Sequence, residues 1–263
     1  MNAQTHYQAG LQQYILNTPK KNILAAIEHF TQAAHLGYAD AHYFLGRFYG
    51  LGDGVSIDFR EAVAHYEKGV SLGSYKCGYA LGLMFHAGMG VDKDDEIARD
   101  YFKQNFDVLL DEANHKDVVS MHILGTYYYY GFYVQRYIFK AIEWFLKAAE
   151  LGYSDSQYML GMIYESLGED DKQKMSAVHY YELASKQDHP YALYALGILA
   201  IEEERFKDAV IYLERAARQQ YALAAYTLGM YYHEKEPKSP LKAFEWFMVA
   251  AKQHHTEAEY YVG

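Results

Sequence analysis

The chain has 263 residues, a net charge of −10 at pH 7 and a composition that is 51% hydrophobic. The acidic balance argues against a broad nucleic-acid-binding surface, because such a surface needs an excess of basic residues. No apolar stretch reaches the roughly 20 residues of a membrane-spanning helix, and residues 1–10 lack the basic start and apolar run of a signal peptide. These observations predict a folded chain without a transmembrane segment.

From the first residues onward, a Leu-Gly pair or its equivalent recurs along the chain. Its glycines are Gly10, Gly46, Gly82, Gly125, Gly161, Gly197, Gly229 and Gly263, and four of the steps between them are 36 residues long. A second marker is an alanine, which in six of seven cases stands 20 residues before the next of these glycines. The alanines are Ala26, Ala62, Ala98, Ala141, Ala177, Ala209 and Ala243. A period of 20–50 residues predicts a repeat architecture such as a solenoid.

Each repeat is predicted to be a pair of helices, the first carrying the glycine and the second the alanine. Large apolar residues stand four positions after each alanine, and small ones stand seven positions after most of them, which is the spacing of one helix face. Because closely packed helices need small residues where they cross, we expect the glycine of the first helix to face the alanine of the second.

The connections between these helices are also predictable in chain order. Gly52 and Gly54 in the second repeat are suited to end a helix in a left-handed conformation, and Asp58 is suited to cap the next helix. The third repeat has seven extra residues after Ala98, which is two helical turns, so a longer helix is expected over residues 94–113. Near the end of the chain, Ser239 before Pro240 predicts another helix start.

These motifs resemble the Sel-one-like repeats, a subclass of the tetratricopeptide repeat. The segment from Ala41 to Val55 matches the first half of the family pattern, and the segment from Lys140 to Gly152 matches the second half. Tyr133 departs from the pattern by replacing the second loop glycine. The resemblance implies an all-α, right-handed superhelical solenoid that mediates protein–protein interaction without catalysis. We expect a single solenoid domain over residues 1–263, with repeats at about 5–40, 41–76, 77–119, 120–155, 156–191, 192–223 and 224–257 and a partial eighth at 258–263.

No motif in the chain predicts a catalytic, cofactor or metal site. The single cysteine, Cys77, stands where other repeats carry Ala or Ser, so a small, unreactive packing residue is expected. The string from Ser239 to Lys242 fits an S-x-x-K motif, but its companion motifs are missing. The acidic run at residues 92–96 lacks the glycine and glutamate that a calcium loop requires, and the histidines lack a convincing metal spacing.

The candidate partner-binding residues lie on the first helices. One set stands three residues before the repeat glycines and either packs between repeats or faces a concave groove: Tyr43, Tyr79, His122, Tyr158, Tyr194 and Tyr226. A second set stands one, four or five residues after the glycines and is less constrained by the repeat: Arg47, His86, Tyr129, Tyr130, Glu165 and His233. Tyr129 and Tyr130 are either exposed interface residues or local packing residues beside the longer helix.

Three functional hypotheses follow. The first is a non-enzymatic scaffold or adaptor that binds a peptide or a partner domain in the concave groove. The second is an enzyme with an active site grafted onto the solenoid, and the third is a helical-repeat RNA-binding protein, which the charge disfavours. A single cysteine indicates a reducing compartment such as the cytoplasm. The chain ends within an eighth repeat, so it is compatible with a fragment and with an exported effector of a bacterial pathogen that engages host proteins.

Overall fold

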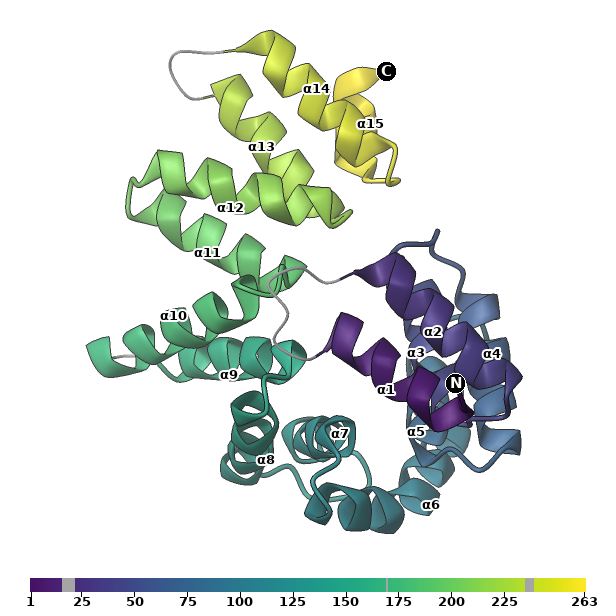
Figure 1. Ribbon diagram of the computed structural model, residues 1–263. Coiled ribbons are helices and arrows are strands. Elements are labelled where there is room, and N and C mark those ends of the chain that lie inside the picture. Colours follow the sequence, from purple (N-terminus) through teal and green to yellow (C-terminus); the bar gives the residue numbers. More distant parts are fainter. Residues whose placement is uncertain (16–21, 169, 235–238) are drawn as a thin grey trace. The chain divides into compact units, whose positions relative to one another are not determined.

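The computed structural model describes residues 1–15, 22–168, 170–234 and 239–263, and every regular element within them is a helix (Figure 1). The helices of the first half are α1 (Ala3–Tyr14), α2 (Ile23–His35), α3 (Ala41–Leu51), α4 (Phe59–Ser71), α5 (Tyr75–Ala87), α6 (Asp95–Asn114), α7 (Val118–Tyr130) and α8 (Ile138–Glu150). They are followed by α9 (Ser154–Leu167), α10 (Asp171–Ser185), α11 (Pro190–Glu202), α12 (Phe206–Arg218), α13 (Ala222–Glu234), α14 (Pro240–Ala251) and α15 (Thr256–Val262). The predicted all-α class is confirmed.

The helices pack as consecutive pairs, as expected of a solenoid. α1 packs on α2, α3 on α4, α5 on α6 and α7 on α8, and the same holds for α11 with α12 and α13 with α14. In the first half of the chain, α5 also contacts α3 on one side and α7 on the other. The first helices of these repeats therefore form one layer, and the second helices pack behind them (Figure 1).

The chain divides into two compact units, Met1–Gln157 and Tyr158–Gly263. The first unit has a continuous aromatic and aliphatic core, in which the stacked rings of Phe30 and Phe44 have centroids 4.4 Å apart. The second unit is built on smaller residues such as Ala216, Leu228 and Ala250. In each unit the core lies between helix pairs, so neighbouring repeats complete one another's apolar surface.

The repeat glycines do not face the alanines, which corrects the expectation from the sequence. Each glycine from Gly10 to Gly229 faces the large side chain four residues after the alanine, for example Tyr66 opposite Gly46 and Phe102 opposite Gly82. A β-carbon at Gly82 would lie 2.9 Å from Cδ1 of Phe102, well inside van der Waals contact. The glycine is therefore needed because the partner helix presents a large side chain, which is an aromatic ring at every position except Gly197, where it is Leu213.

The predicted connections are largely confirmed. Gly52 and Gly88 end their helices with φ of 73° and 68°, and Tyr133, which replaces a loop glycine, adopts φ of 61°. Asp58 caps α4 by accepting hydrogen bonds from the backbone N–H groups of residues 60 and 61. The seven-residue insertion does lengthen a helix, because α6 has 20 residues. Ser239 stands at the start of α14, but its side chain makes no capping hydrogen bond.

Two further sequence expectations concern Cys77 and the membrane. Cys77 is fully buried, and burial raises the pKa of its thiol to about 12, so the side chain is a packing residue with little thiolate at neutral pH. Among the helices that the structure describes, none combines the length and the apolar composition needed to cross a bilayer.

Candidate partner-binding site

The structure separates the twelve candidate residues by exposure. Tyr43 and Tyr79 are buried, with 3% and 5% of their surface exposed. The half-buried residues are Arg47, His122, Tyr129, Tyr158, Tyr194 and Tyr226, and the exposed ones are His86, Tyr130, Glu165 and His233. The buried and half-buried members are occupied by contacts within the chain.

Most residues of the first set pack against an aromatic side chain that lies just before the first helix of the next repeat. Tyr158 stacks on His189 with centroids 4.9 Å apart, and Tyr226 stacks on His255 at 4.5 Å. His122 lies 5.0 Å from Tyr153 in the same way. These contacts agree with the interpretation that the rings pack between repeats, because each ring lies against a residue at the start of the next repeat.

Tyr79 is held by a buried hydroxyl pair. Its hydroxyl oxygen lies 2.6 Å from Oγ1 of Thr126 on α7, whose own hydroxyl donates to the carbonyl of Ile123. Burial raises the pKa of the Tyr79 hydroxyl above its usual range. A partner has no access to this ring in the described conformation.

Arg47 lies inside the first unit, where it bonds to the start of α9. Its Nη2 donates to Oδ2 of Asp155 at 2.6 Å, and its Nη1 donates to the hydroxyl of Tyr153 at 3.3 Å. The guanidinium also lies over the ring of Tyr43, 5.9 Å from the centroid. Burial by itself lowers the pKa of Arg47, but Asp155 and the neighbouring tyrosines, Tyr153 first among them, together outweigh burial and raise the pKa well above its usual value.

This ion pair is unusual for a solenoid. Arg47 and Asp155 are 108 residues apart, whereas repeats of a solenoid normally contact only their sequence neighbours. The side chains are only 15% and 20% exposed. The first helices of the second and fifth repeats are therefore tied together within the first unit, and the groove position expected of Arg47 is occupied by the chain's own carboxylate.

The accessible candidates of the first unit, His86, Tyr129 and Tyr130, gather in an aromatic patch that also contains Phe132 and Arg136. Tyr130 is 56% exposed, stacks on Phe132 with centroids 5.3 Å apart and meets Tyr129 edge-on at 4.8 Å. His86 lies 5.5 Å from the ring of Phe132. The patch thus joins the ends of α5 and α7 and the loop after α7.

Arg136 adds a positive charge to the aromatic patch. Its Nε donates to the carbonyl oxygen of Tyr129 at 3.0 Å, and its guanidinium lies 5.8 Å from the Tyr129 ring centroid. Sequence reasoning identified His86, Tyr129 and Tyr130 but missed Arg136. The sequence places Arg136 in the loop between two predicted helices, five residues after Gly131, and this position was the available signal.

The remaining candidates lie in the second unit and do not form one cluster. Glu165 accepts a hydrogen bond from the hydroxyl of Tyr181 at 2.5 Å, and the ring of Tyr194 lies 5.3 Å from that of Tyr221. His233 lies 5.8 Å from Tyr261. The first two contacts lie within one repeat, and the third joins α13 to α15.

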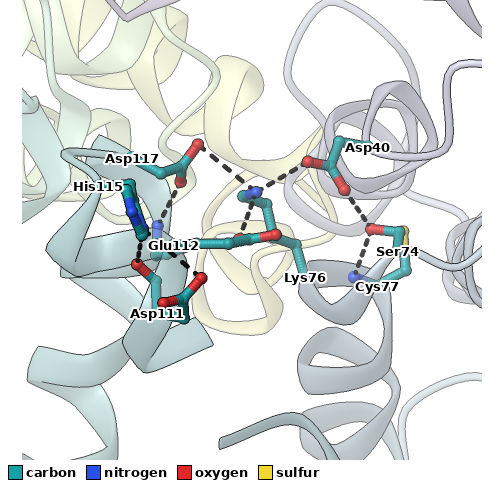
Figure 2. Close-up of polar contacts among 9 residues, drawn as sticks. Asp40, Ser74, Lys76, Cys77, Asp111, Glu112, His115 and Asp117 are labelled. Atoms are coloured by element: carbon teal, nitrogen blue, oxygen red, sulfur yellow. Dashed lines mark hydrogen bonds and ion pairs between the residues drawn. The ribbon is translucent and has the colours of Figure 1, made fainter. Parts of the chain in front are cut away.

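A buried charge network around Lys76 was also missed. Figure 2 shows the Lys76 ammonium between Asp40 on one side and Glu112 and Asp117 on the other, at 2.8, 2.8 and 3.5 Å. Its side chain is only 2% exposed. Burial lowers the pKa of Lys76, but the three carboxylates outweigh burial and raise it above its usual value.

The network links the helix pairs α3–α4, α5–α6 and α7–α8, because Asp40 stands at the N-cap of α3, Lys76 and Glu112 lie on α5 and α6, and Asp117 caps α7. Ser74 donates to Asp40 at 2.6 Å, and the hydroxyl of Ser120 donates to Glu112. A sequence signal did exist, because Asp40 and Lys76 stand at equivalent positions of adjacent repeats, six residues before their glycines. Opposite charges at equivalent positions of a solenoid are brought together by stacking of the repeats.

The part of the chain that the structure describes holds no group of three or more His, Cys, Asp or Glu side chains arranged to bind a metal ion. The aromatic patch presents exposed rings, tyrosine hydroxyls and the guanidinium of Arg136.

Comparison with known proteins agrees with this architecture. The Sel1 repeat profile matches seven segments, at residues 6–38, 39–74, 79–104, 118–153, 154–189, 190–221 and 222–255. The chain belongs to the Sel1 repeat family. Members of this family generally mediate protein–protein interaction.

Individual Sel1 relatives cover different shares of the chain. HRD3B of Arabidopsis thaliana, an ERAD-associated E3 ubiquitin-protein ligase component, is 32% identical over 101 residues, which is 38% of this chain and 16% of that protein. A Sel1 repeat protein from Oxalobacter formigenes is 26% identical over 99% of this chain and 75% of its own, with a TM-score of 0.53.

A third relative is c5321, a protective antigen of uropathogenic Escherichia coli strains with the same repeat fold. It is 26% identical over 99% of this chain, with a TM-score of 0.52. The chain spans 56% of that structure and 16% of HRD3B, so it corresponds to part of each.

Proposed function

We propose that this Sel1 repeat chain is a non-enzymatic interaction module that binds a peptide or a partner domain through its aromatic patch. The family supports the general role, because Sel1 repeat proteins bind other proteins. The patch supports the location, since it contains the candidate residues of the first unit that remain accessible.

The observation that carries the proposal is the exposure of Tyr130. A tyrosine that is 56% exposed, stacked on Phe132 and flanked by Arg136, presents the residue types that dominate protein interfaces. By contrast, Tyr43 and Tyr79 are buried between packed helices. A partner that covers Tyr130 would bury its ring without the cost of opening the core.

The test is quantitative capture of partners from lysate of the source cells, using the parent chain and the Tyr129→Ala/Tyr130→Ala variant. Truncation of an interface hot spot costs about 2 kcal/mol or more, so we expect roughly a thirtyfold or greater loss of affinity for a captured protein. Circular dichroism must show the same helix content for both chains.

A matched control removes exposed aromatic rings elsewhere. Phe244 and Tyr260 are 48% and 84% exposed and lie in the second unit. The Phe244→Ala/Tyr260→Ala variant should retain the partner. Equal capture by the parent and the Tyr129→Ala/Tyr130→Ala variant would refute the proposed location.

The same proposal places the chain in a reducing compartment such as the cytoplasm. The single cysteine cannot form an intramolecular disulfide, and Cys77 is buried. Cell fractionation with a tagged full-length protein tests this placement, and recovery of the protein outside the cell would contradict it.

A further inference from the structure

The Trp246 pocket, a cavity of about 370 Å³, lies in the second unit between α12, α13 and α14. Its lining consists of two aromatic rings, two carboxylates, one ammonium group and one apolar side chain: Tyr232, Trp246, Glu214, Glu245, Lys242 and Val249. Small-molecule sites have volumes of roughly 300–1,000 Å³. Aromatic faces and carboxylates both attract cations, so this lining suits a positively charged group.

The fourth repeat carries nearly the same set of residues, and the comparison shows what the pocket lacks. Counted from the marker alanines, four residues of α8 correspond to four of α14: Lys140 to Lys242, Glu143 to Glu245, Trp144 to Trp246 and Lys147 to Val249. Counted from the repeat glycines, Tyr128 corresponds to Tyr232. The two sets therefore differ at one position, where valine replaces lysine.

In the fourth repeat, each of the two rings carries an ammonium group of the chain itself. Nζ of Lys140 lies 4.7 Å from the ring centroid of Tyr128, and Nζ of Lys147 lies 3.8 Å from that of Trp144. A cation within about 6 Å of a ring centroid is attracted by the ring. Trp144 is only 7% exposed. The repeat thus accommodates two cations side by side.

The seventh repeat retains only the first of these cations. Nζ of Lys242 lies 5.0 Å from the ring centroid of Tyr232, as Lys140 does on its own tyrosine. Val249 cannot supply the second cation, and among the described residues no cation lies over the ring of Trp246, which is half-buried. The pocket therefore lies where the fourth repeat places its second ammonium group.

The charges around the pocket also favour a cation. Lys242 is the only cation in the described lining, against the carboxylates of Glu214 and Glu245. Glu214 has Arg218 at 3.7 Å, whereas Glu245 forms no ion pair with any described residue. Burial and, after it, the charge of Glu214 raise the pKa of the Tyr232 hydroxyl, so this carboxylate acts on the ring that lines the pocket. The net charge of −10 adds a long-range attraction for cations.

We propose that the Trp246 pocket binds an alkylammonium group, with its charge over the Trp246 ring and its carbon chain along Val249, in the way that the side chain of Lys147 covers Trp144. A lysine side chain of a partner protein and a free aliphatic amine are two sources of this chemistry. The pocket is in the second unit and does not depend on the aromatic patch.

The first experiment uses the two tryptophans of the chain as internal reporters. The proton–nitrogen NMR spectrum of the full chain contains one indole N–H signal from each, and a Trp246→Phe variant assigns them. The chain is titrated with n-butylammonium and with n-butanol, which has a similar shape but no charge. Only the Trp246 signal should shift saturably with n-butylammonium.

The charge sets the expected difference between the probes. A cation over an aromatic ring and beside exposed carboxylates should bind about fivefold or more tightly than the neutral analogue. Added salt should reduce this difference, because it screens exposed charges. The absence of a saturable Trp246 shift, or equal affinities for n-butylammonium and n-butanol, overturns the proposal.

Reciprocal variants test the position. Val249→Lys supplies the chain's own ammonium group and should weaken n-butylammonium binding about tenfold or more. Lys147→Val should open the equivalent site, so that the Trp144 signal also responds. The matched control is Ile211→Lys, which adds the same charge at a 57% exposed position of the second unit outside the pocket lining. Equal binding by Val249→Lys and Ile211→Lys would overturn the assignment, and the comparison of probes on the parent chain stands even if a variant does not fold.

A last comparison separates the two sources. Nα-acetyl-lysine methylamide that binds at least as tightly as n-butylammonium assigns the pocket to a lysine of a partner protein, and weaker binding assigns it to a free amine. The Tyr129→Ala/Tyr130→Ala variant should bind n-butylammonium like the parent chain, so failure of the aromatic patch and failure of this pocket are distinguishable.

Discussion

Replacing the repeat glycine Gly46 by alanine tests how the helix pairs are held together. Gly46 lies in the middle of α3 opposite Tyr66, and an added β-carbon would lie 2.7 Å from both Cδ1 and Cζ of that ring. Carbon atoms pack best at roughly 3.5–4.0 Å. Tyr66 is only 5% exposed, so its ring cannot move into solvent.

The expected magnitude follows from two opposing effects. Alanine in place of glycine stabilises a helix interior by about 1 kcal/mol, whereas forcing an extra carbon into a packed core costs about 1–3 kcal/mol or somewhat more. Because several atoms of one rigid ring are affected, the clash should win. We expect Gly46→Ala to lower the free energy of unfolding by about 1–2 kcal/mol.

Gly50 in the same helix provides the control. A β-carbon at Gly50 would meet only Cβ of Ala62 at 3.8 Å, an ordinary contact. Gly50→Ala should therefore stabilise the chain by up to about 1 kcal/mol. Urea unfolding followed by circular dichroism at 222 nm would measure both variants.

A third variant identifies the cause. In a Tyr66→Ala background the ring is absent, so Gly46→Ala should no longer destabilise the chain. If Gly46→Ala and Gly50→Ala have the same unfolding free energy, or if the effect of Gly46→Ala persists without the ring, the explanation of the repeat glycine is refuted.

Three other predictions address single side chains. Lys76→Met should lower the free energy of unfolding by about 3 kcal/mol at neutral pH, because it leaves three carboxylates without their cation. The loss should be smaller in acid, where the carboxylates are protonated. An equal loss in the exposed Lys93→Met control would contradict this prediction. Burial and nearby positive charge lower the pKa of His42 from 6.5 to about 4, so the neutral ring contributes its full stabilisation above pH 6.5. This stabilisation of about 3 kcal/mol is lost as the pH falls from 6.5 towards 4. His42→Phe should therefore show a shallower loss of unfolding free energy in acid titration than the parent, and identical curves would argue against this role. Cys77, fully buried with a pKa of about 12, should react with a thiol reagent at least about a hundredfold more slowly in the native chain than in urea; comparable rates would show that the third repeat opens readily.

The helix pairs were predictable because the signals for them are local. The spacing of small and large residues along each helix, the glycines at Gly52 and Gly88 and the cap at Asp58 all act within a few residues of themselves. The seven-residue insertion was equally readable, since whole helical turns lengthen α6 without rotating its apolar face.

The contact across each helix pair was harder to predict. Both Ala62 and Tyr66 lie on the face of α4 that packs against α3, and the spacing alone does not say which of them meets Gly46. The choice depends on how the two helices slide along each other, and this is set by packing of the whole pair.

The candidate site shows the same division. The sequence by itself determined that the chain is a Sel1-type solenoid and that Tyr129 and Tyr130 are not needed by the repeat pattern. Only the tertiary structure decided that Tyr130 is exposed while Tyr43 is enclosed, that Asp155 binds Arg47 from 108 residues away, and that Lys76 holds three carboxylates together. The physical reason is that helix formation depends on neighbours in sequence, whereas exposure and ion pairing depend on how the stacked repeats curve, and that curvature is the sum of many small rotations between repeats.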